Sequence, residues 1–437
     1  MGGILKYGIP YGRSQLFFEV PQESIAFNGE MTRLPALADF ERALRYALDH
    51  PIETPALKEL VRDKENILFL VEDATRNTPL NKIIPIVTGY LNRNGVPDDA
   101  ISFLTAPGTH RVMTEWEIKE KLGVETVRRF KIYQHNASVS EDIADLGAVK
   151  LRSQIPVRIP VHVNRRALSA DLLIGLGSIV PHSDAGFSGG AKILQPGVCD
   201  FVTTSATHAA AALCPDIPLG MVEGNPCREG IEAVARKIGL SFILNVVQNY
   251  EGESAGVFAG DFIKAHRAGV ALSRLSFSVD VPRLADIVIV SSSPADMDYW
   301  QANKALSCAY FTVKKGGTII FAAPCHEGLA HNHPRFREWL ALPLSEVLKR
   351  LRSTSPEDTE ADVVSAVLAV CNCRVRDKAH IFFVGEGLTN EDLRALKYKR
   401  IATVQQALDE ALREKPDALV GILPKGGISL PRVRDAT

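Results

Sequence analysis

Short, uninterrupted apolar runs recur along the chain and restrict its fold more than any other feature. Six of them are expected to form strands buried on both faces: Ile67–Val71, Ile101–Thr105, Leu172–Leu176, Ile287–Val290, Thr318–Ala322 and Ile381–Val384. Between many of them lie segments with helical periodicity: Leu80–Asn92, Trp116–Leu122, Gly230–Ile238 and Val404–Leu412. Continuous apolar strands that alternate with helices are typical of parallel sheets covered by helices. We therefore predict an α/β fold with mainly parallel sheets.

The chain has 437 residues, which is too long for one ordinary core and favours two domains. The segment Phe277–Pro282 precedes a new strand and is the expected boundary. We expect an N-terminal domain over residues 1–277 and a smaller C-terminal α/β domain over residues 278–437. The cleft between two such domains is the expected place for an active site.

Composition excludes several classes of protein. Apolar residues make up 46% and charged residues 23%, and the formal net charge is -1, so no basic surface for nucleic acid is expected. The first residues lack the pattern of a secretory signal, and no apolar run approaches the ~18 residues of a membrane helix. Seven cysteines without CxxC spacing are more typical of reduced thiols than of a zinc site. We expect a cytoplasmic protein without a membrane partner.

Polar side chains follow three of the predicted strands at the point where each strand ends. Asp73 and Arg76 come after the first, His110 after the second and His182 after the third. In parallel α/β sheets, the carboxyl ends of the strands form the edge where ligands bind. The sequence therefore predicts a site at this edge.

A glycine-rich segment follows His182 and ends at a lysine. Gly186, Gly189 and Gly190 would let backbone N–H groups approach an anion, and Lys192 would add a positive charge. The spacing is not that of a P-loop. A glycine-rich turn with a solvated lysine remains the alternative interpretation.

Further candidates lie on predicted helices and a loop. His208 occurs in an alanine-rich helix, where it is either a packed or surface residue or a metal ligand. Gln301 and Lys304 are three residues apart, so they share a helix face and offer an amide and an ammonium to a carboxylate or an oxygen, unless they only begin an exposed helix. His326 follows another strand and has no assigned role, whereas His331 and His333 are expected on the surface.

Taken together, these motifs resemble the nickel-dependent lactate racemase family over nearly the whole chain. The residues that carry the resemblance are Asp73-x-Thr75-Arg76, Gly108-Thr109-His110, Pro181-His182, Gly186-Phe187-Ser188-Gly189-Gly190-Ala191-Lys192, Pro196-Gly197, His208 and Gln301-x-x-Lys304. The resemblance implies a racemase or epimerase of 2-hydroxy acids. No single motif is decisive, but their shared order along the chain is.

The resemblance also implies a cofactor, the nickel-pincer nucleotide, a pyridinium mononucleotide with two sulfur-bearing arms. Lys192 resembles the lysine that holds one thioacyl arm, covalently in some members, and His208 resembles the protein ligand of the nickel. Imidazole and soft sulfur together suit square-planar Ni(II). The other residues expected near the nucleotide are Asp73, Thr75, Gly189 and Gly190. Separate enzymes synthesise this cofactor, so they are implied partners, and recombinant protein can lack it.

The remaining motif residues resemble the groups that act on the substrate. His110 and His182 resemble a pair of general bases, and Arg76, Gln301 and Lys304 resemble the groups that hold the substrate. The family's reaction implies reversible hydride transfer from the substrate C2 to the pyridinium carbon. Two bases are useful because the hydroxyl occupies two positions in the two enantiomers, and the unperturbed pKa of histidine, about 6.5, suits proton exchange near neutral pH.

Two other functions stay open from the sequence. One is a nicotinamide-type dehydrogenase of 2-hydroxy acids, although no Gly-x-Gly-x-x-Gly opens a helix after a strand. The other is a non-catalytic carrier of nickel or nucleotide, which would have no use for Arg76 or paired bases. The sequence does not decide which 2-hydroxy acid is the substrate, whether Asp184 faces the pocket and disfavours a second carboxylate, or which oligomer forms.

Overall fold

The computed structural model describes residues 3–152, 156–214 and 219–434. The chain divides into two compact units. Unit 1 contains the chain up to Thr32, the short segment Pro181–Ser183 and the chain from Phe277 onward; unit 2 contains Arg33–Val180 and Asp184–Ser276. The last change of unit, between Ser276 and Phe277, lies at the expected boundary, whereas the first 32 residues, expected in the N-terminal domain, group with the C-terminal one.

Unit 2 is built on a six-stranded sheet with the order β13-β12-β9-β4-β5-β6. All neighbouring pairs are parallel except β12 and β13, which are antiparallel. The strands are β4 (Ile67–Val71), β5 (Ile101–Thr105), β6 (Lys131–Gln134), β9 (Leu172–Ser178), β12 (Phe242–Gln248) and β13 (Ser254–Gly260), with a separate hairpin of β7 (Ile143–Arg152) and β8 (Pro156–Asn164) and a short pair of β10 (Pro181–His182) and β11 (Gly186–Phe187). The helices are α1 (Phe40–Asp49), α2 (Leu57–Leu60), α3 (Leu80–Arg93), α4 (Glu115–Leu122), α5 (Val124–Arg129), α6 (Arg165–Ser169), α7 (Phe201–Ala212), α8 (Pro226–Ile238) and α9 (Lys264–Phe277).

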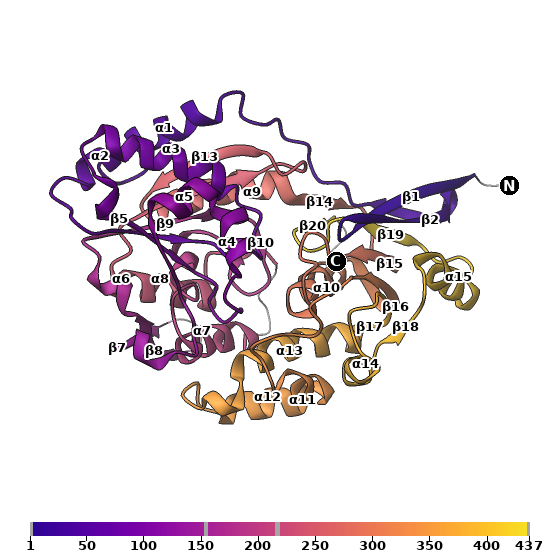
Figure 1. Cartoon of the computed structure of the whole chain (residues 1–437). Coiled ribbons are helices and arrows are strands. Elements are labelled where there is room, and N and C mark those ends of the chain that lie inside the picture. The colour runs from indigo at the N-terminus through magenta and orange to yellow at the C-terminus, as the bar shows by residue number, and fades with distance from the viewer. Residues whose placement is uncertain (1–2, 153–155, 215–218, 435–437) are drawn as a thin grey trace. The chain divides into compact units, whose positions relative to one another are not determined.

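Both faces of this sheet are buried, which explains the uninterrupted apolar strands. Phe69 packs in a core with residues of α1 and α3, and its neighbour Leu70 packs in a second core with residues of α7 and α8. Figure 1 shows these helix pairs on opposite sides of β5 and β9. Successive side chains of a strand point to opposite faces, so a strand between two helical layers must be apolar at every position. Each fully buried large apolar side chain contributes about 1.5–3 kcal/mol.

Unit 1 is built on a second six-stranded sheet, with the order β18-β17-β16-β15-β19-β3 and only parallel pairs. The strands are β3 (Ile25–Asn28), β15 (Ala285–Ser291), β16 (Val313–Ala322), β17 (Ala379–Val384), β18 (Lys399–Arg400) and β19 (Val420–Leu423), with a parallel pair of β14 (Ser278–Val281) and β20 (Leu430–Val433). The helices are α10 (Tyr299–Thr312), α11 (Phe336–Ala341), α12 (Leu344–Ser353), α13 (Val363–Lys378), α14 (Asn390–Leu396) and α15 (Val404–Glu414). The predicted α/β class with two domains is confirmed.

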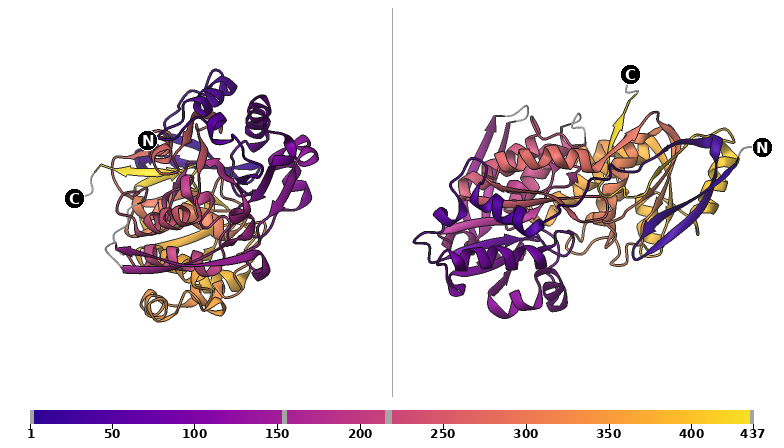
Figure 2. Two further views of the ribbon diagram at one scale, coloured as in Figure 1. Left: turned by 90° about the vertical axis from the view of Figure 1, so that its left-hand side faces the viewer. Right: turned by 90° about the horizontal axis from the view of Figure 1, so that it is seen from above.

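The first residues of unit 1 form a hairpin of β1 (Ile4–Tyr11) and β2 (Ser14–Pro21). Ile9, Phe18 and Val20 of this hairpin share a core with α15 and with β15 and β16. Figure 2 shows the hairpin as a long indigo ribbon beside the yellow α15. The apolar face of the hairpin therefore explains why the N-terminal segment belongs to unit 1.

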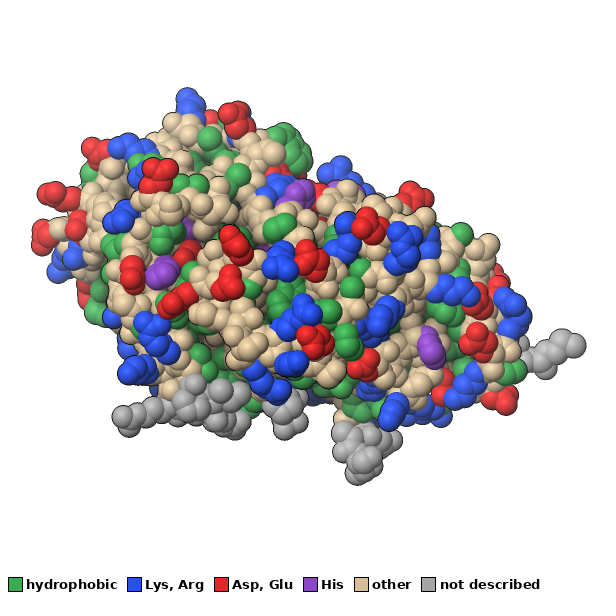
Figure 3. Space-filling view, turned by 90° about the horizontal axis from the view of Figure 1, so that it is seen from below, with side chains coloured by type: hydrophobic (Ala, Val, Ile, Leu, Met, Phe, Trp, Pro, Cys, Tyr) green, Lys and Arg blue, Asp and Glu red, His purple; other side chains and the backbone are tan. Residues whose placement is uncertain are grey.

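The surface charges and the lengths of the helices agree with what the composition predicts. Acidic and basic side chains are interspersed on the face drawn in Figure 3, in keeping with a net charge of -1. Within the described ranges, none of the helices combines the length and the apolar character that crossing a membrane requires.

Candidate functional site

The loops after β4 and β5 bring Asp73 and His110 into contact. The two strands are parallel neighbours that end in register at Val71 and Thr105, so their loops leave the sheet side by side. Asp73 Oδ2 lies 2.9 Å from His110 Nδ1, and the Asp73 side chain is buried. Burial raises the pKa of Asp73, but His110, Arg76 and Thr75 together lower it below its usual range, so the carboxylate stays ionised. It accepts the Nδ1 proton of His110, and this tautomer leaves the basic lone pair on Nε2.

Asp73 and Thr75, which the sequence predicts near a nucleotide, both support His110 in the structure. Thr75 Oγ1 donates to Asp73 Oδ1 over 2.7 Å, and Arg76 Nη1 donates to Thr75 Oγ1 over 2.6 Å. The chain of contacts runs from a guanidinium through a hydroxyl and a carboxylate to an imidazole. It fixes the side chains of His110 and Arg76 relative to one another.

Two residues that the sequence did not single out hold the loop after β4. The ammonium of Lys121, on α4, donates to the carbonyls of Arg76 and Thr78. The carboxylate of Glu72 accepts from the Thr78 hydroxyl and, over 3.1 Å, from the Ser178 N–H at the end of β9. Glu72 follows a buried strand and could have been found by that signal, but nothing local indicates Lys121.

Lys192 follows the glycine-rich segment and is half-buried. Its ammonium has no hydrogen bond or ion pair within the part of the chain that the structure describes. Burial, with the charge of Arg76 as the next cause, lowers the pKa of Lys192 to about 8. At pH 7 roughly a tenth of the Lys192 side chain is therefore a neutral, nucleophilic amine, and this fraction rises with pH.

Packing explains the glycines beside Lys192. A Cβ at Gly189 would lie 2.7 Å from Ile179, and one at Gly190 would lie 2.9 Å from the ring of His266. The N–H of Gly190 donates to the Asn245 side chain over 2.8 Å, and the N–H of Lys192 donates to the Gly189 carbonyl over 3.2 Å. The predicted backbone cradle for an anion therefore loses its donors at residues 190 and 192.

A buried arginine donates hydrogen bonds to the backbone of the same segment. Arg228, on α8, donates to the carbonyl of Ala185 over 3.1 Å, to that of Gly189 over 3.3 Å and to that of Phe187. The sequence reading missed this residue, because an arginine within an amphipathic helix ordinarily faces solvent. Its role here is to fix the backbone that carries Lys192.

His208 lies on α7 with 6% of its surface exposed. Its Nδ1 lies 3.0 Å from the Thr204 carbonyl, one helical turn earlier, which makes Nδ1 the protonated nitrogen. Burial lowers the pKa of His208 to about 4, so the imidazole is neutral at pH 7. Nε2 has no hydrogen-bond partner among the described residues. A neutral imidazole whose other nitrogen donates to a carbonyl is the usual form of a metal-ligating histidine.

Gln301 and Lys304 lie on one face of α10, as their spacing predicts. The helix begins after Asp298, whose side chain accepts from the Gln301 N–H over 2.8 Å. Lys304 Nζ donates to Gln301 Oε1 over 2.5 Å. The two side chains together offer N–H donors suited to a carboxylate. His182 is half-buried at the end of β10 and groups with unit 1.

Three further histidine and carboxylate predictions have different outcomes. The carboxylate of Asp184 interacts with Lys192 and His208, so its charge acts on the pocket side of the loop. His326 is exposed after β16. The prediction for His333 was wrong, because this side chain is buried against Trp300 and Asp362. The loop pattern held no sign of Asp362, which lies 29 residues further on.

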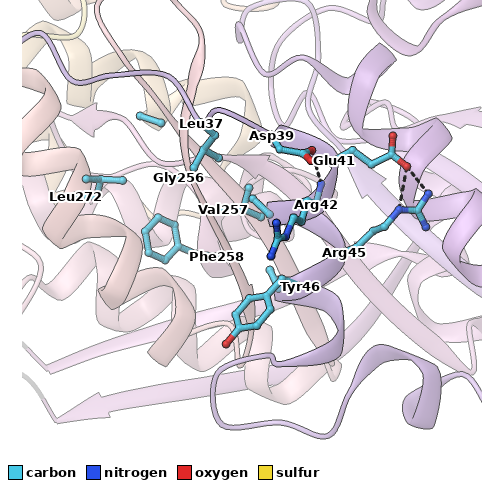
Figure 4. Close-up of a pocket in the computed structure, with 13 residues that line it drawn as sticks. Leu37, Asp39, Glu41, Arg42, Arg45, Tyr46, Gly256, Val257, Phe258 and Leu272 are labelled. Carbon is cyan, nitrogen blue, oxygen red and sulfur yellow. Dashed lines mark hydrogen bonds and ion pairs between the residues drawn. The ribbon is translucent and has the colours of Figure 1, made fainter.

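A groove of about 1060 Å³ opens on unit 2 between α1, β13 and α9. Figure 4 shows Arg45 bonded to Glu41 and Asp39 bonded to the start of α1 at its rim. The described residues that line it include none of the predicted site residues. It is a separate surface feature of unit 2.

The fold and the site define a class of protein: a two-unit α/β protein whose unit 2 holds His110 against a buried carboxylate and carries a lysine and a histidine whose pKa values are lowered by burial. Comparison with known families agrees over most of the chain. Residues 11–219 match the lactate racemase N-terminal domain, and residues 281–430 match the lactate racemase C-terminal domain.

Individual relatives give the same result. The chain is 32% identical to the lactate racemase of Lactiplantibacillus plantarum over 436 residues, which cover 96% of this chain and 97% of the relative. It is 31% identical to the lactate racemase of Thermoanaerobacterium thermosaccharolyticum over 372 residues, which cover 82% and 85%. The chain therefore belongs to the lactate racemase family.

Solved structures share the fold. The lactate racemase apoprotein from Thermoanaerobacterium thermosaccharolyticum superimposes with a TM-score of 0.85 at 28% identity and covers 98% of this chain and 100% of its own. A protein from Thermotoga maritima superimposes with a TM-score of 0.71 at 24% identity over 90% and 98%, which supports the fold alone.

Proposed function

We propose that this protein racemises or epimerises a 2-hydroxy acid. The observation that carries the proposal is the contact between the ionised Asp73 and His110, in a loop that also presents Arg76. Deprotonating a substrate hydroxyl needs a base that is oriented and neutral, and a buried carboxylate on Nδ1 provides the orientation. The lactate racemases among its relatives support the substrate class.

In this proposal the chain supplies two bases and three carboxylate-binding groups. His110 Nε2 takes the hydroxyl proton of one enantiomer, and Asp73 stabilises the imidazolium that forms. His182 takes the corresponding proton of the other enantiomer. Arg76 and the Gln301–Lys304 pair are proposed to hold the carboxylate and the oxygen of the substrate.

The residues of unit 2 fit a nickel-pincer nucleotide by the chemistry of their donors. His208 would be the nitrogen ligand of the nickel, and the amine of Lys192 would bind a thioacid arm. Among the described residues, no group of three or more His, Cys, Asp or Glu side chains could hold a metal by itself, so further ligands would come from the cofactor. When bound, the nucleotide supplies the acceptor for the hydrogen at C2. Asp73, Thr75, Gly189 and Gly190 are proposed to lie beside it.

The test is racemisation by protein produced together with the cofactor-synthesis enzymes. Single enantiomers of lactate, malate, longer 2-hydroxy acids and sugar acids are incubated with it, and chiral chromatography measures the product. We expect interconversion of at least one acid. His110→Ala and His182→Ala should abolish turnover and keep the nickel content of the wild type. No interconversion of any acid by protein with nickel bound would refute the proposal.

The substrate class can be narrowed by charge. Because the carboxylate of Asp184 interacts with Lys192 and His208, a second substrate carboxylate would be repelled there. We expect lactate to be preferred to malate, and Asp184→Asn to raise kcat/KM for malate relative to lactate. An unchanged ratio would remove Asp184 from the determinants of specificity.

A further inference from the structure

The first turn of α10 is tied to the loop that follows β16. The N–H of Tyr299 donates to the Gly328 carbonyl over 2.9 Å, and that of Trp300 donates to the Leu329 carbonyl over 3.1 Å. The first N–H groups of a helix have no acceptor within the helix, so this loop satisfies them. The turn that precedes Gln301 therefore has one defined position in unit 1.

Trp300 is held on its face and on its edge. Its ring stacks on His333 with centroids 3.7 Å apart and planes 6° apart, and Phe336 packs edge-on with centroids 5.0 Å apart. Only 8% of Trp300 is exposed. Stacked and edge-to-face neighbours together leave the indole a single orientation.

The ring of His333 is itself fixed by Asp362. His333 Nδ1 lies 3.0 Å from Asp362 Oδ1, and both side chains are buried, with 3% and 6% exposed. Asp362 caps α13 and accepts from the N–H and the hydroxyl of Ser365. Its φ of 50° is uncommon outside glycine, and such a conformation persists where the surroundings require it. The contacts thus connect α13 to α10 through two side chains.

The position of Trp300 in the helix gives this connection a use. Trp300 is four residues and Gln301 three residues before Lys304, so Lys304 neighbours both side chains on the surface of α10. Its Nε1–H has no hydrogen-bond acceptor among the described residues. A rigid indole beside groups that are proposed to bind the carboxylate would limit the side chain that a bound acid can carry.

We propose that Asp362 and His333 are positioning residues that hold Trp300, and that Trp300 limits the size of the substrate side chain beside Gln301 and Lys304. The proposal rests on the proposed function, because it takes Gln301 and Lys304 as substrate-binding groups. It assigns a role to a buried histidine–carboxylate pair that the proposed reaction does not use directly.

Kinetics of the cofactor-loaded enzyme test the connection. His333→Ala frees the indole, so KM for a short 2-hydroxy acid should rise about 10-fold while kcat changes less than about 2-fold. His333→Phe keeps a planar ring under the indole and should restore most of the affinity. The matched control is His331→Ala, in the same loop, whose side chain is 43% exposed and pairs with Glu327. It should leave both constants unchanged.

Trp300→Ala tests the size limit. It should raise kcat/KM for 2-hydroxyhexanoate relative to lactate by about 10-fold or more, because one methylene in a pocket is worth about 10–200-fold. An unchanged preference would overturn the role of Trp300. A wild-type KM in His333→Ala, or an equal rise in His331→Ala, would overturn the role of His333.

Fluorescence separates this inference from the proposed function, since it needs neither turnover nor cofactor. The chain has three tryptophans, so Trp116→Phe with Trp339→Phe leaves Trp300 as the one emitter. Adding His333→Ala should raise the emission, because a stacked imidazole quenches indole, and should lower its anisotropy. Unchanged emission and anisotropy would overturn the positioning role. If the wild type racemises no 2-hydroxy acid, the proposed function and the size limit fail, and the fluorescence result alone decides the positioning.

Discussion

Basic side chains of the two units differ in whether a carboxylate is bonded to them. In unit 2, His208 and Lys192 have no carboxylate hydrogen-bonded to them among the described residues, and burial lowers their pKa values to about 4 and about 8. In unit 1, buried His333 is bonded to Asp362, and Asp286 binds both Lys314 and Lys415. His208 and Lys192 of unit 2 are thus desolvated, whereas His333, Lys314 and Lys415 of unit 1 are paired with carboxylates.

Desolvated bases and paired bases are suited to different chemical functions. A desolvated base is neutral, so it can ligate a metal or attack an electrophile. A paired base is fixed in orientation and supports the geometry around it. Unit 2 also contains paired histidines, His162 with Asp200 and His110 with Asp73, and His110 is the one that is proposed to move a proton. Four predictions test this contrast.

The largest expected effect is on metal retention. His208→Ala should weaken nickel binding about 1000-fold, beyond the 10–100-fold that loss of an outer partner of a metal ligand typically costs. Metal analysis after competition with a chelator measures it. His135→Gln is the control, because His135 is also buried with a pKa of about 4 but has both ring nitrogens bonded, to Cys199 and Asn164. If both variants keep their nickel, desolvation of His208 serves packing alone.

Asp73→Asn should lower kcat about 100-fold, because the amide no longer selects the Nδ1-protonated tautomer of His110. Steady-state racemisation measures it. Asp200→Asn is the matched control, since Asp200 lies 2.8 Å from His162 Nδ1 in the same unit and asparagine keeps its helix cap. An equal loss in both variants would mean that such pairs are structural.

Acid should destabilise unit 2 earlier than unit 1. His135 and His208 bind protons with a pKa near 6.5 when unfolded and near 4 when folded, so the unfolded state binds more protons between these pH values. The free energy of unfolding should therefore fall as the pH drops from 7 to 5, on the order of 1–2 kcal/mol for each histidine. Hydrogen exchange measures it, with α7 losing protection before β15. Equal loss in both helix and strand would contradict the contrast.

The smallest effect is expected in unit 1. Lys415, Lys314 and the Leu419 N–H bond to Asp286 and lower its pKa to about 2 against the effect of burial. The side chains of Lys314 and Lys415 are 42% and 62% exposed. Asp286→Asn should therefore lower the free energy of unfolding by only about 1 kcal/mol at pH 7, measured by urea unfolding. Because the folded pKa lies below the unfolded one, the difference between wild type and variant should shrink as the pH falls from 4 toward 2. A constant difference would assign the effect to packing.

Much of the fold could be predicted because burial on both faces leaves a direct mark on the sequence. Ile67–Val71 and Ile101–Thr105 have the predicted bounds, and the loops after them carry the predicted polar residues. The edge strand β13 and the β1–β2 hairpin escaped prediction, since their half-exposed residues lack such runs. The pairing of β3 with β19 joins distant segments, which no local pattern records.

The site was predictable residue by residue but not in its contacts. Asp73 and His110 were both singled out, yet their contact depends on the register of β4 against β5. Arg228 and Lys121 were missed because their acceptors are backbone carbonyls, which every sequence has. His333 was misplaced for a similar reason, as its burial depends on a partner in another helix.

The pairing of β3 with β19 has a consequence for biosynthesis. Ile25–Asn28 leaves the ribosome long before Val420–Leu423, so the early strand stays without its partner until that later segment has been made. The sheet of unit 2 requires only strands between Ile67 and Gly260, and it can close during translation. A nascent chain would thus complete the sheet of unit 2 while Ile25–Asn28 still lacks its partner, and an unpaired strand can pair with other chains.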